Sequence, residues 1–128
     1  MKSPLTKVLA LAAGLVSAAP VAAQALPDGV TAATISQGQQ LFGSVGICFA
    51  CHAQDGSGMP GAGPDLTDAD WLQVDGSFEE IVQVIVRGVP ADEAETGALM
   101  PPKGGSQLTD EQVRAVAAYV WSLSNGSD

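Results

Sequence analysis

Apolar residues recur three or four positions apart in three segments of the chain, the spacing of one buried face of an α-helix. These segments are residues 35–46, 78–88 and 109–123. Each begins at a serine or threonine followed three residues later by glutamine or glutamate, which is typical of a capping box: Thr34 with Gln37, Ser77 with Glu80, and Thr109 with Gln112. The pattern therefore predicts three amphipathic helices. A fourth, shorter helix is expected within residues 67–74.

Glycine and proline dominate the stretches between these segments. Residues 53–64 hold four glycines and two prolines, and residues 89–105 hold three of each. Both stretches are expected to be loops, and neither an alternating strand pattern nor an internal repeat is present, so the expected fold class is all-α. Gly38 lies inside the first expected helix. It either allows another helix to approach closely or is tolerated there at a cost of about 1 kcal/mol.

The first 25 residues predict a secretory signal peptide. Lys2 and Lys7 form a short positive region before the apolar residues 8–19, and Ala23-Gln24-Ala25 reads as a cleavage site. An uncleaved N-terminal anchor is the alternative. Residues 26–33 are expected to form a flexible lead-in, and residues 34–128 a single domain. Secretion predicts a periplasmic location, where two free cysteines would tend to form a disulfide.

Acidic residues strongly outnumber basic ones after the predicted cleavage site. That part of the chain has 14 aspartates and glutamates, and its only basic residues are Arg87, Lys103 and Arg114. Nucleic acid is excluded as a partner, because such binding depends on lysine and arginine. Anionic lipid would repel the chain, so membrane contact is expected only through partners. We expect a protein partner with a basic or an apolar docking face.

The main chemical signal is the segment Cys48-Phe49-Ala50-Cys51-His52, which reads C-x-x-C-H. This is the attachment pattern of a c-type haem, in which both thiols bind the porphyrin and the histidine ligates the iron. A thiol redox pair or half of a zinc site are the alternatives. We expect one covalent haem c.

His52 is the only histidine in the chain, so a second histidine ligand is excluded. The thioethers of Met59 and Met100 are the candidates for the opposite face of the iron, beside an open or water-bound position. Met100 is favoured because it follows a whole helix, and because Pro101 biases it towards an extended conformation. Met59 follows His52 too closely to reach the other face. The predicted metal ligands are therefore His52 and Met100.

The chain resembles the class I monohaem c-type cytochromes of the bacterial periplasmic type. Beyond the C-x-x-C-H segment, the resemblance is carried by Gly63-Pro64-Asp65-Leu66, by Met100-Pro101-Pro102 and by the last helix with Tyr119. It covers about residues 34–124 and implies a small cytochrome c fold, with about four helices wrapped around one covalent haem.

The resemblance also implies roles for single residues. The carbonyl of Pro64 should accept a hydrogen bond from His52 and orient its ring. Gly38 and Phe42 should meet the last helix near Val116 and Tyr119, which favours the close-packing interpretation of Gly38. The Trp71 indole is a weaker candidate for a contact to a haem propionate. Arg87 could pair with a propionate or act as a charge at the end of its helix.

The expected function is one-electron transfer between periplasmic redox enzymes, with no catalytic residues and no enzymatic activity of its own. Phe49, Ala50, Met59 and Pro60 are expected to border the exposed haem edge. Two alternatives share the haem: a dedicated haem subunit of a dehydrogenase or terminal oxidase, and a small haem enzyme or gas sensor with an open iron position. A thiol–disulfide oxidoreductase is a further alternative, although the chain lacks the βαβ pattern of that class.

Overall fold

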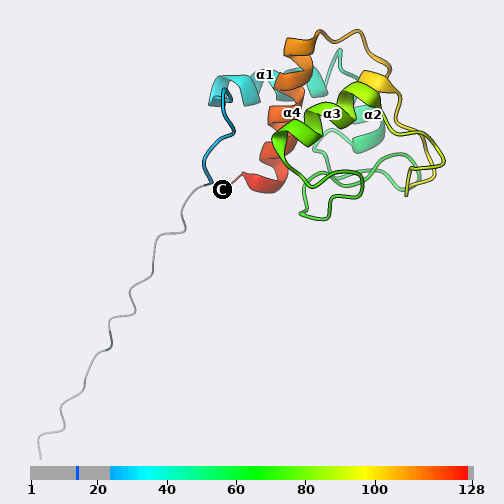
Figure 1. Ribbon diagram of the computed structural model, residues 1–128, viewed down its shortest axis with the longest axis horizontal. Helices are drawn as coiled ribbons and strands as arrows, with labels where there is room; N and C mark the ends of the chain where they lie inside the picture. The colour runs from blue at the N-terminus through cyan, green and yellow to red at the C-terminus, as the bar shows by residue number, and fades with distance from the viewer. Residues whose placement is uncertain (1–13, 15–23, 127–128) are drawn as a thin grey trace, which may run out of the picture.

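The structure is a computed structural model that describes Gly14 and residues 24–126. In chain order it has α1 (Ala32–Phe42), α2 (Phe49–His52), α3 (Phe78–Arg87), the 3-10 helix η1 (Pro102–Gly105) and α4 (Asp110–Asn125) (Figure 1). The described residues contain no β-strand, only two isolated bridges. The prediction of an all-α fold with about four helices is thus confirmed, although the short fourth α-helix is α2 and not the expected one within residues 67–74. Apart from Gly14, Gln24 and Ala25, the predicted signal peptide lies outside the described residues.

Helix α1 begins earlier than the pattern predicts. Its N-cap is Thr31, whose hydroxyl accepts from the Thr34 N–H at 3.1 Å, while the Thr34 hydroxyl accepts from the Thr31 N–H at 3.4 Å. The predicted start at Thr34 is therefore wrong, and the lead-in ends before Ala32. The reason is that a threonine hydroxyl here replaces the longer glutamine of the expected capping box. The helix also ends at Phe42, before the predicted residue 46.

The bounds of the other long helices agree with the prediction. At α4, the Gln112 N–H donates to the Thr109 hydroxyl at 3.2 Å and the Thr109 N–H to the Gln112 side chain at 2.9 Å, which confirms this capping box. At α3 the predicted box is wrong, because the Ser77 side chain makes no capping bond. The Ser77 N–H instead donates to Asp75 at 2.8 Å.

Residues 67–74 do not form the expected short helix. The Asp65 carboxylate accepts from the N–H of Thr67 at 2.7 Å, and Asp68 accepts from the N–H of Asp70 at 3.0 Å. Such local side-chain bonds compete with helical hydrogen bonds and favour turns. This segment instead forms irregular chain that lines the cavity described below.

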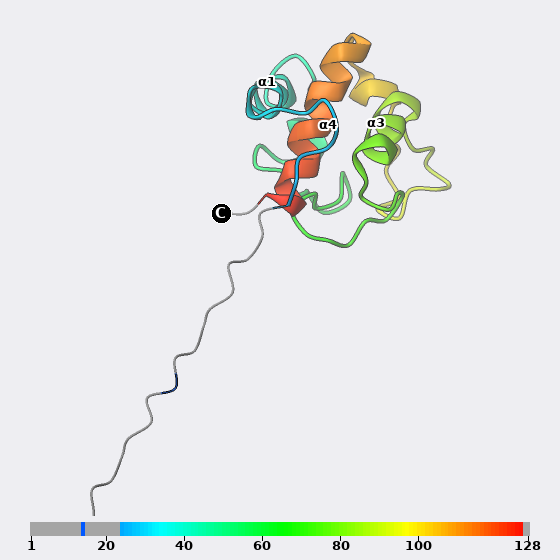
Figure 2. The same cartoon turned by 60° about the vertical axis from the view of Figure 1, so that its left-hand side comes forward.

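Helix α4 lies between α1 and α3 and packs against both (Figure 2). A Cβ atom at Gly38 would overlap the carbonyl oxygen of Ala115 and lie 2.9 Å from the Tyr119 Cβ. The predicted close packing at Gly38 is confirmed, with Ala115 rather than Val116 as the opposing backbone. One turn along α1, the Phe42 and Tyr119 rings meet edge to face with centroids 5.3 Å apart. This crossing fixes α1 on α4.

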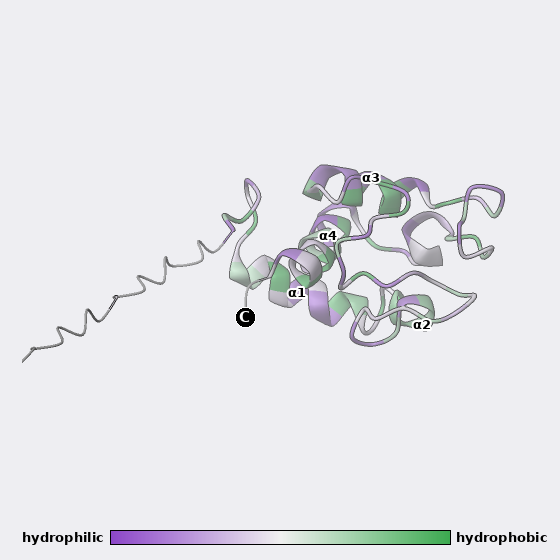
Figure 3. Ribbon diagram, turned by 90° about the horizontal axis from the view of Figure 1, so that it is seen from below, coloured by the Kyte–Doolittle hydropathy of each residue, from purple (hydrophilic) through white to green (hydrophobic). Residues whose placement is uncertain are grey.

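Helices α1 and α3 bury one side and expose the other, whereas α4 is buried all round over residues 115–120 because it lies between them. Hydrophobic and hydrophilic colours alternate along all three helices (Figure 3). The buried side of α3 consists of Phe78, Ile81, Val82 and Ile85. These residues form the core together with the buried residues of α4 and with Val30, Phe42 and Leu108. Among the described residues, we find no helix with the length and apolar character needed to cross a bilayer.

Candidate functional site

A single large cavity collects the residues that the sequence singles out. It measures about 1110 Å³, including space open to solvent, and its walls are mostly apolar side chains of α3, α4 and two loops. Cys48, Cys51, His52 and Met100 all line it. Large, mainly apolar cavities with a few convergent polar groups are the usual form of a cofactor site.

The two cysteines are presented by one short helical turn. The His52 N–H donates to the Cys48 carbonyl at 3.0 Å, so Cys48, Cys51 and His52 follow one another around α2. The chain reverses on either side of this turn, where Ile47 has φ 60° and Ala53 has φ 61°. Positive φ is unusual for residues other than glycine, and rarer still for a β-branched residue such as isoleucine. The turn is thus held between two strained residues.

His52 is buried, and its Nδ1 lies 3.0 Å from the Pro64 carbonyl oxygen. A carbonyl can only accept, so Nδ1 donates and Nε2 is left with its lone pair free for a metal. Burial lowers the pKa of His52, although the bond to Pro64 acts in the opposite direction. The pKa is lowered on balance, which favours the neutral imidazole that can ligate iron. The predicted contact between His52 and Pro64 is confirmed.

The loop that carries Pro64 packs directly on α2. A Cβ atom at Gly63 would lie 2.7 Å from the Cys51 carbonyl oxygen, so only glycine allows this approach. The Gly58 N–H donates to the His52 carbonyl at 2.8 Å, which ties the loop to the same turn. The glycines of this loop therefore serve to bring the Pro64 carbonyl to the His52 ring.

Met100 reaches the cavity from the far end of the other loop. Its backbone pairs with Val89, just after α3, through two hydrogen bonds of 2.8 Å. Met100 is half-buried and lines the cavity, whereas Met59 is 43% exposed and does not line it. This placement supports Met100 over Met59 as the second axial ligand, which stays a prediction.

The weaker expectations have mixed outcomes. Trp71 lines the cavity, with its indole packed on Gly76, and its contact to a propionate stays a prediction. Arg87 is not among the lining residues. Its Nη1 atom donates to the Gly88 carbonyl oxygen at 3.4 Å and lies 3.9 Å from Glu93 Oε2. Its role as a charge at the helix end is therefore favoured.

The four residues predicted to border the haem edge lie on the surface and outside the cavity wall. The exposed apolar residues at the cavity are instead Ile47, Leu72 and Leu99, which are 46%, 42% and 56% exposed. Ile47 could have been found from its position directly before Cys48. Leu72 and Leu99 come from distant loops and carried no recognisable signal.

These residues fit a covalent haem better than a thiol redox centre. Burial raises the pKa of the Cys48 thiol to about 11, whereas reactive redox cysteines have lowered values. Two thiols one turn apart, a neutral imidazole, a thioether and apolar walls are the groups that a haem c needs. The described residues that line the cavity include no lysine or arginine, and their carboxylates are Asp65, Asp70 and Glu95.

Comparison with known proteins agrees with this chemistry. A family described as cytochrome C oxidase, cbb3-type, subunit III, matches residues 33–120, more than half of the chain. The chain belongs to this family. Its resemblance to c-type cytochromes is thereby confirmed.

Relatives with this family name come from several bacteria. The cbb3-type cytochrome c oxidase subunit FixP of Sinorhizobium medicae is 46% identical over 79 residues, covering 60% of this chain and 26% of that protein. The subunit CcoP of Rhodobacter capsulatus is 36% identical over 101 residues, covering 73% of this chain and 31% of that protein. The chain thus spans about a quarter to a third of the length of these relatives.

A solved structure supports the fold. Cytochrome CL of the marine methylotroph Methylophaga aminisulfidivorans superposes with a TM-score of 0.55 at 21% identity. The match covers 71% of this chain and 53% of that one. The cytochrome c fold expected from the sequence is therefore confirmed.

Proposed function

We propose that this chain is a haem-carrying electron-transfer component of a terminal oxidase of the cbb3 type. The observation that carries this proposal is the cavity shared by Cys48, Cys51, His52 and Met100, in a chain of a family named for such an oxidase. The family and its relatives favour a dedicated oxidase component over the freely diffusing carrier that the sequence first suggests.

In this proposal one haem c is bound through thioether links to Cys48 and Cys51, since the chain has only these two cysteines. When bound, haem c supplies a one-electron couple. The chain's own residues hold the ligand set: Pro64 orients His52, and the Val89–Met100 pairing presents the Met100 thioether. Apolar side chains of α3 and α4 form part of the cavity wall. We propose a periplasmic location, which follows from the predicted signal peptide.

Two substitutions in the full chain, produced in cells with haem-attachment machinery, test the ligand set. Met100→Leu should abolish the weak far-red band of ferric iron bound to methionine and lower the midpoint potential, because methionine ligation raises it. Met59→Leu is the matched control and should leave both unchanged. Loss of the band in Met59→Leu with retention in Met100→Leu would reject the assignment. Haem lost from the chain on denaturation would reject covalent attachment.

Oxidation of the reduced chain by a purified cbb3-type oxidase tests the partner. The chain is strongly acidic, so a basic docking face should give an electron-transfer rate that falls as salt rises. A rate no faster than that of an unrelated acidic cytochrome would contradict a dedicated role. Rapid carbon monoxide binding by the ferrous chain would instead favour the gas-sensor alternative.

A further inference from the structure

Met100 makes backbone hydrogen bonds to another segment of the chain, but the residues directly after it do not. Met100 itself is paired with Val89, but Pro101 and Pro102 follow and have no N–H to donate. The next backbone bond runs from the Gly104 N–H to the Pro101 carbonyl at 2.9 Å, within the same turn. The Pro101–Pro102 backbone packs closely against Gly88. Among the described residues, however, a hydrogen bond that ties this side of Met100 to a segment outside its own turn comes from a side chain.

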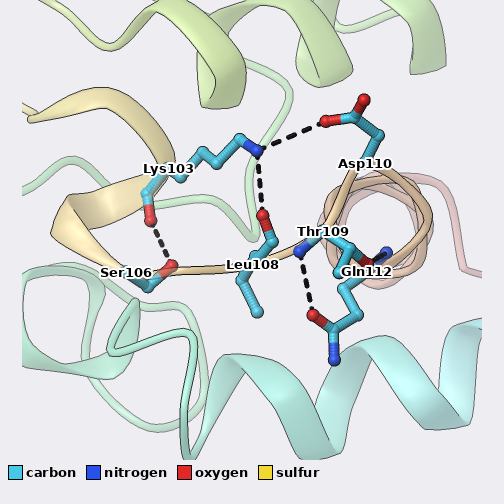
Figure 4. Close-up of polar contacts among 6 residues, drawn as sticks. All are labelled: Lys103, Ser106, Leu108, Thr109, Asp110 and Gln112. Carbon is cyan, nitrogen blue, oxygen red and sulfur yellow. Dashed lines mark hydrogen bonds and ion pairs between the residues drawn. The ribbon is translucent and has the colours of Figure 1, made fainter.

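Lys103 provides that attachment (Figure 4). Its Nζ donates to the Leu108 carbonyl at 2.8 Å and lies 3.3 Å from Asp110 Oδ1. The Lys103 side chain is 28% exposed and that of Asp110 is 95% exposed. An ion pair to so exposed a carboxylate contributes little, so the bond to the carbonyl is the stronger contact. Leu108 is buried in the core directly before α4.

The backbone of Lys103 is fixed as well. It adopts a left-handed conformation, φ 53° and ψ 28°, followed by Gly104 and Gly105 with positive φ. This conformation costs a residue with a side chain about 1 kcal/mol, and glycine would avoid that cost. The Lys103 carbonyl accepts from the buried Ser106, from its hydroxyl at 2.6 Å and its N–H at 3.1 Å. Lys103 is thus held at its backbone and at its ammonium group.

We propose that Lys103 is a positioning residue that keeps the Met100 thioether at the iron in the oxidised protein. The inference rests on the proposed function, in which Met100 is a ligand. Lys103 fixes the Met100 segment relative to α4, whose Val116 and Val120 line the same cavity. Methionine ligation favours reduced iron, as its effect on potential indicates. Ferric iron therefore binds the thioether less strongly than ferrous iron does. Loosening of the segment that carries Met100 should thus be detected first in the ferric state.

The test is binding of imidazole to the ferric, haem-loaded full chain, in which the imidazole nitrogen replaces the Met100 sulfur. Lys103→Ala should raise the apparent affinity for imidazole about tenfold, as expected for loss of a charge-assisted hydrogen bond. Lys103→Gly should give the same rise in imidazole affinity, although glycine removes the backbone strain at this position. Lys103→Arg should restore most of the original affinity.

Arg114→Ala is the control for charge and general stability. It removes a cation and a 2.9 Å ion pair to Glu79 on the surface where α3 meets α4. It should leave the imidazole affinity unchanged at a temperature where circular dichroism shows all variants folded. An unchanged affinity in Lys103→Ala, or an equal rise in Arg114→Ala, would overturn the inference alone. Absence of the ferric methionine band in the unsubstituted chain would overturn the ligand assignment and this inference with it.

Discussion

Replacing Gly38 with alanine tests the crossing of α1 over α4. The new Cβ would overlap the Ala115 carbonyl oxygen and lie 2.6 Å from its carbon and 2.9 Å from the Tyr119 Cβ. Two of these atoms are backbone within α4, so no side-chain rotation can relieve the clash. The helices must separate, and the edge contact between Phe42 and Tyr119 is lost with them.

The magnitude follows from three terms. Overpacking against backbone costs about 3 kcal/mol, and loss of the aromatic contact adds about 1 kcal/mol. Alanine gains about 1 kcal/mol over glycine in helix propensity. The net expectation is a destabilisation of about 3 kcal/mol, which corresponds to a fall in Tm of roughly 10–20 °C for a domain of this size.

Denaturant unfolding of the haem-loaded chain, followed by circular dichroism, measures this change. Gln37→Ala is the matched control, because Gln37 is exposed on the same helix and its replacement should have little effect. If Gly38→Ala were neutral or stabilising, helix propensity alone would decide the outcome. The close approach of α1 and α4 would then be refuted.

Three further substitutions test other parts of the structure. Ala53, at φ 61° and ψ 164°, occupies a region suited to glycine, so Ala53→Gly should stabilise the chain by about 1 kcal/mol; a lower denaturation midpoint would contradict the strain. Hydrogen bonds from Arg114 lower the pKa of Glu79 below its ordinary 4.5, so the folded state gains stability above that pH and loses it as pH falls through the lowered value. The free energy of unfolding, measured as a function of pH, should thus fall less steeply on the acid side for Glu79→Gln than for the unsubstituted chain. Identical slopes would exclude a stabilising Glu79–Arg114 ion pair. Glu95 lines a cavity whose described walls include no lysine or arginine, and Glu95→Gln should raise the midpoint potential in redox titration by on the order of tens of millivolts, because loss of a nearby negative charge disfavours ferric iron; a lower potential would contradict this placement.

Signals contained in a few consecutive residues were predictable from the sequence. The C-x-x-C-H segment needs only one helical turn to align its two cysteines and its histidine, and the structure forms that turn. The Thr109 capping box is likewise local, because its partners are three residues apart. The bounds of α3 followed from its apolar spacing and from Gly88 at its end.

Predictions failed where several local solutions compete. Thr31 and Thr34 are both suitable N-cap residues for α1. The capping box that forms is a pair of threonine hydroxyls, which lacks the glutamine or glutamate by which a capping box is usually recognised. Asp65 and Asp68 turned a helix-like stretch into irregular chain through bonds to their neighbours. Apolar spacing alone cannot rank these bonds against helical ones, because each differs by only about 1 kcal/mol.

The sequence by itself determined the attachment motif, the absence of a second histidine, the acidic charge and the helical class. The tertiary structure places His52, Pro64 and Met100 around one cavity, as the sequence predicts, and it alone decided that Leu72 and Leu99 are the exposed apolar residues at that cavity and that Arg87 does not line it. The physical reason is chain distance. Contacts within a turn are set by backbone geometry, whereas contacts between distant loops exist only once α1 and α3 have packed on α4.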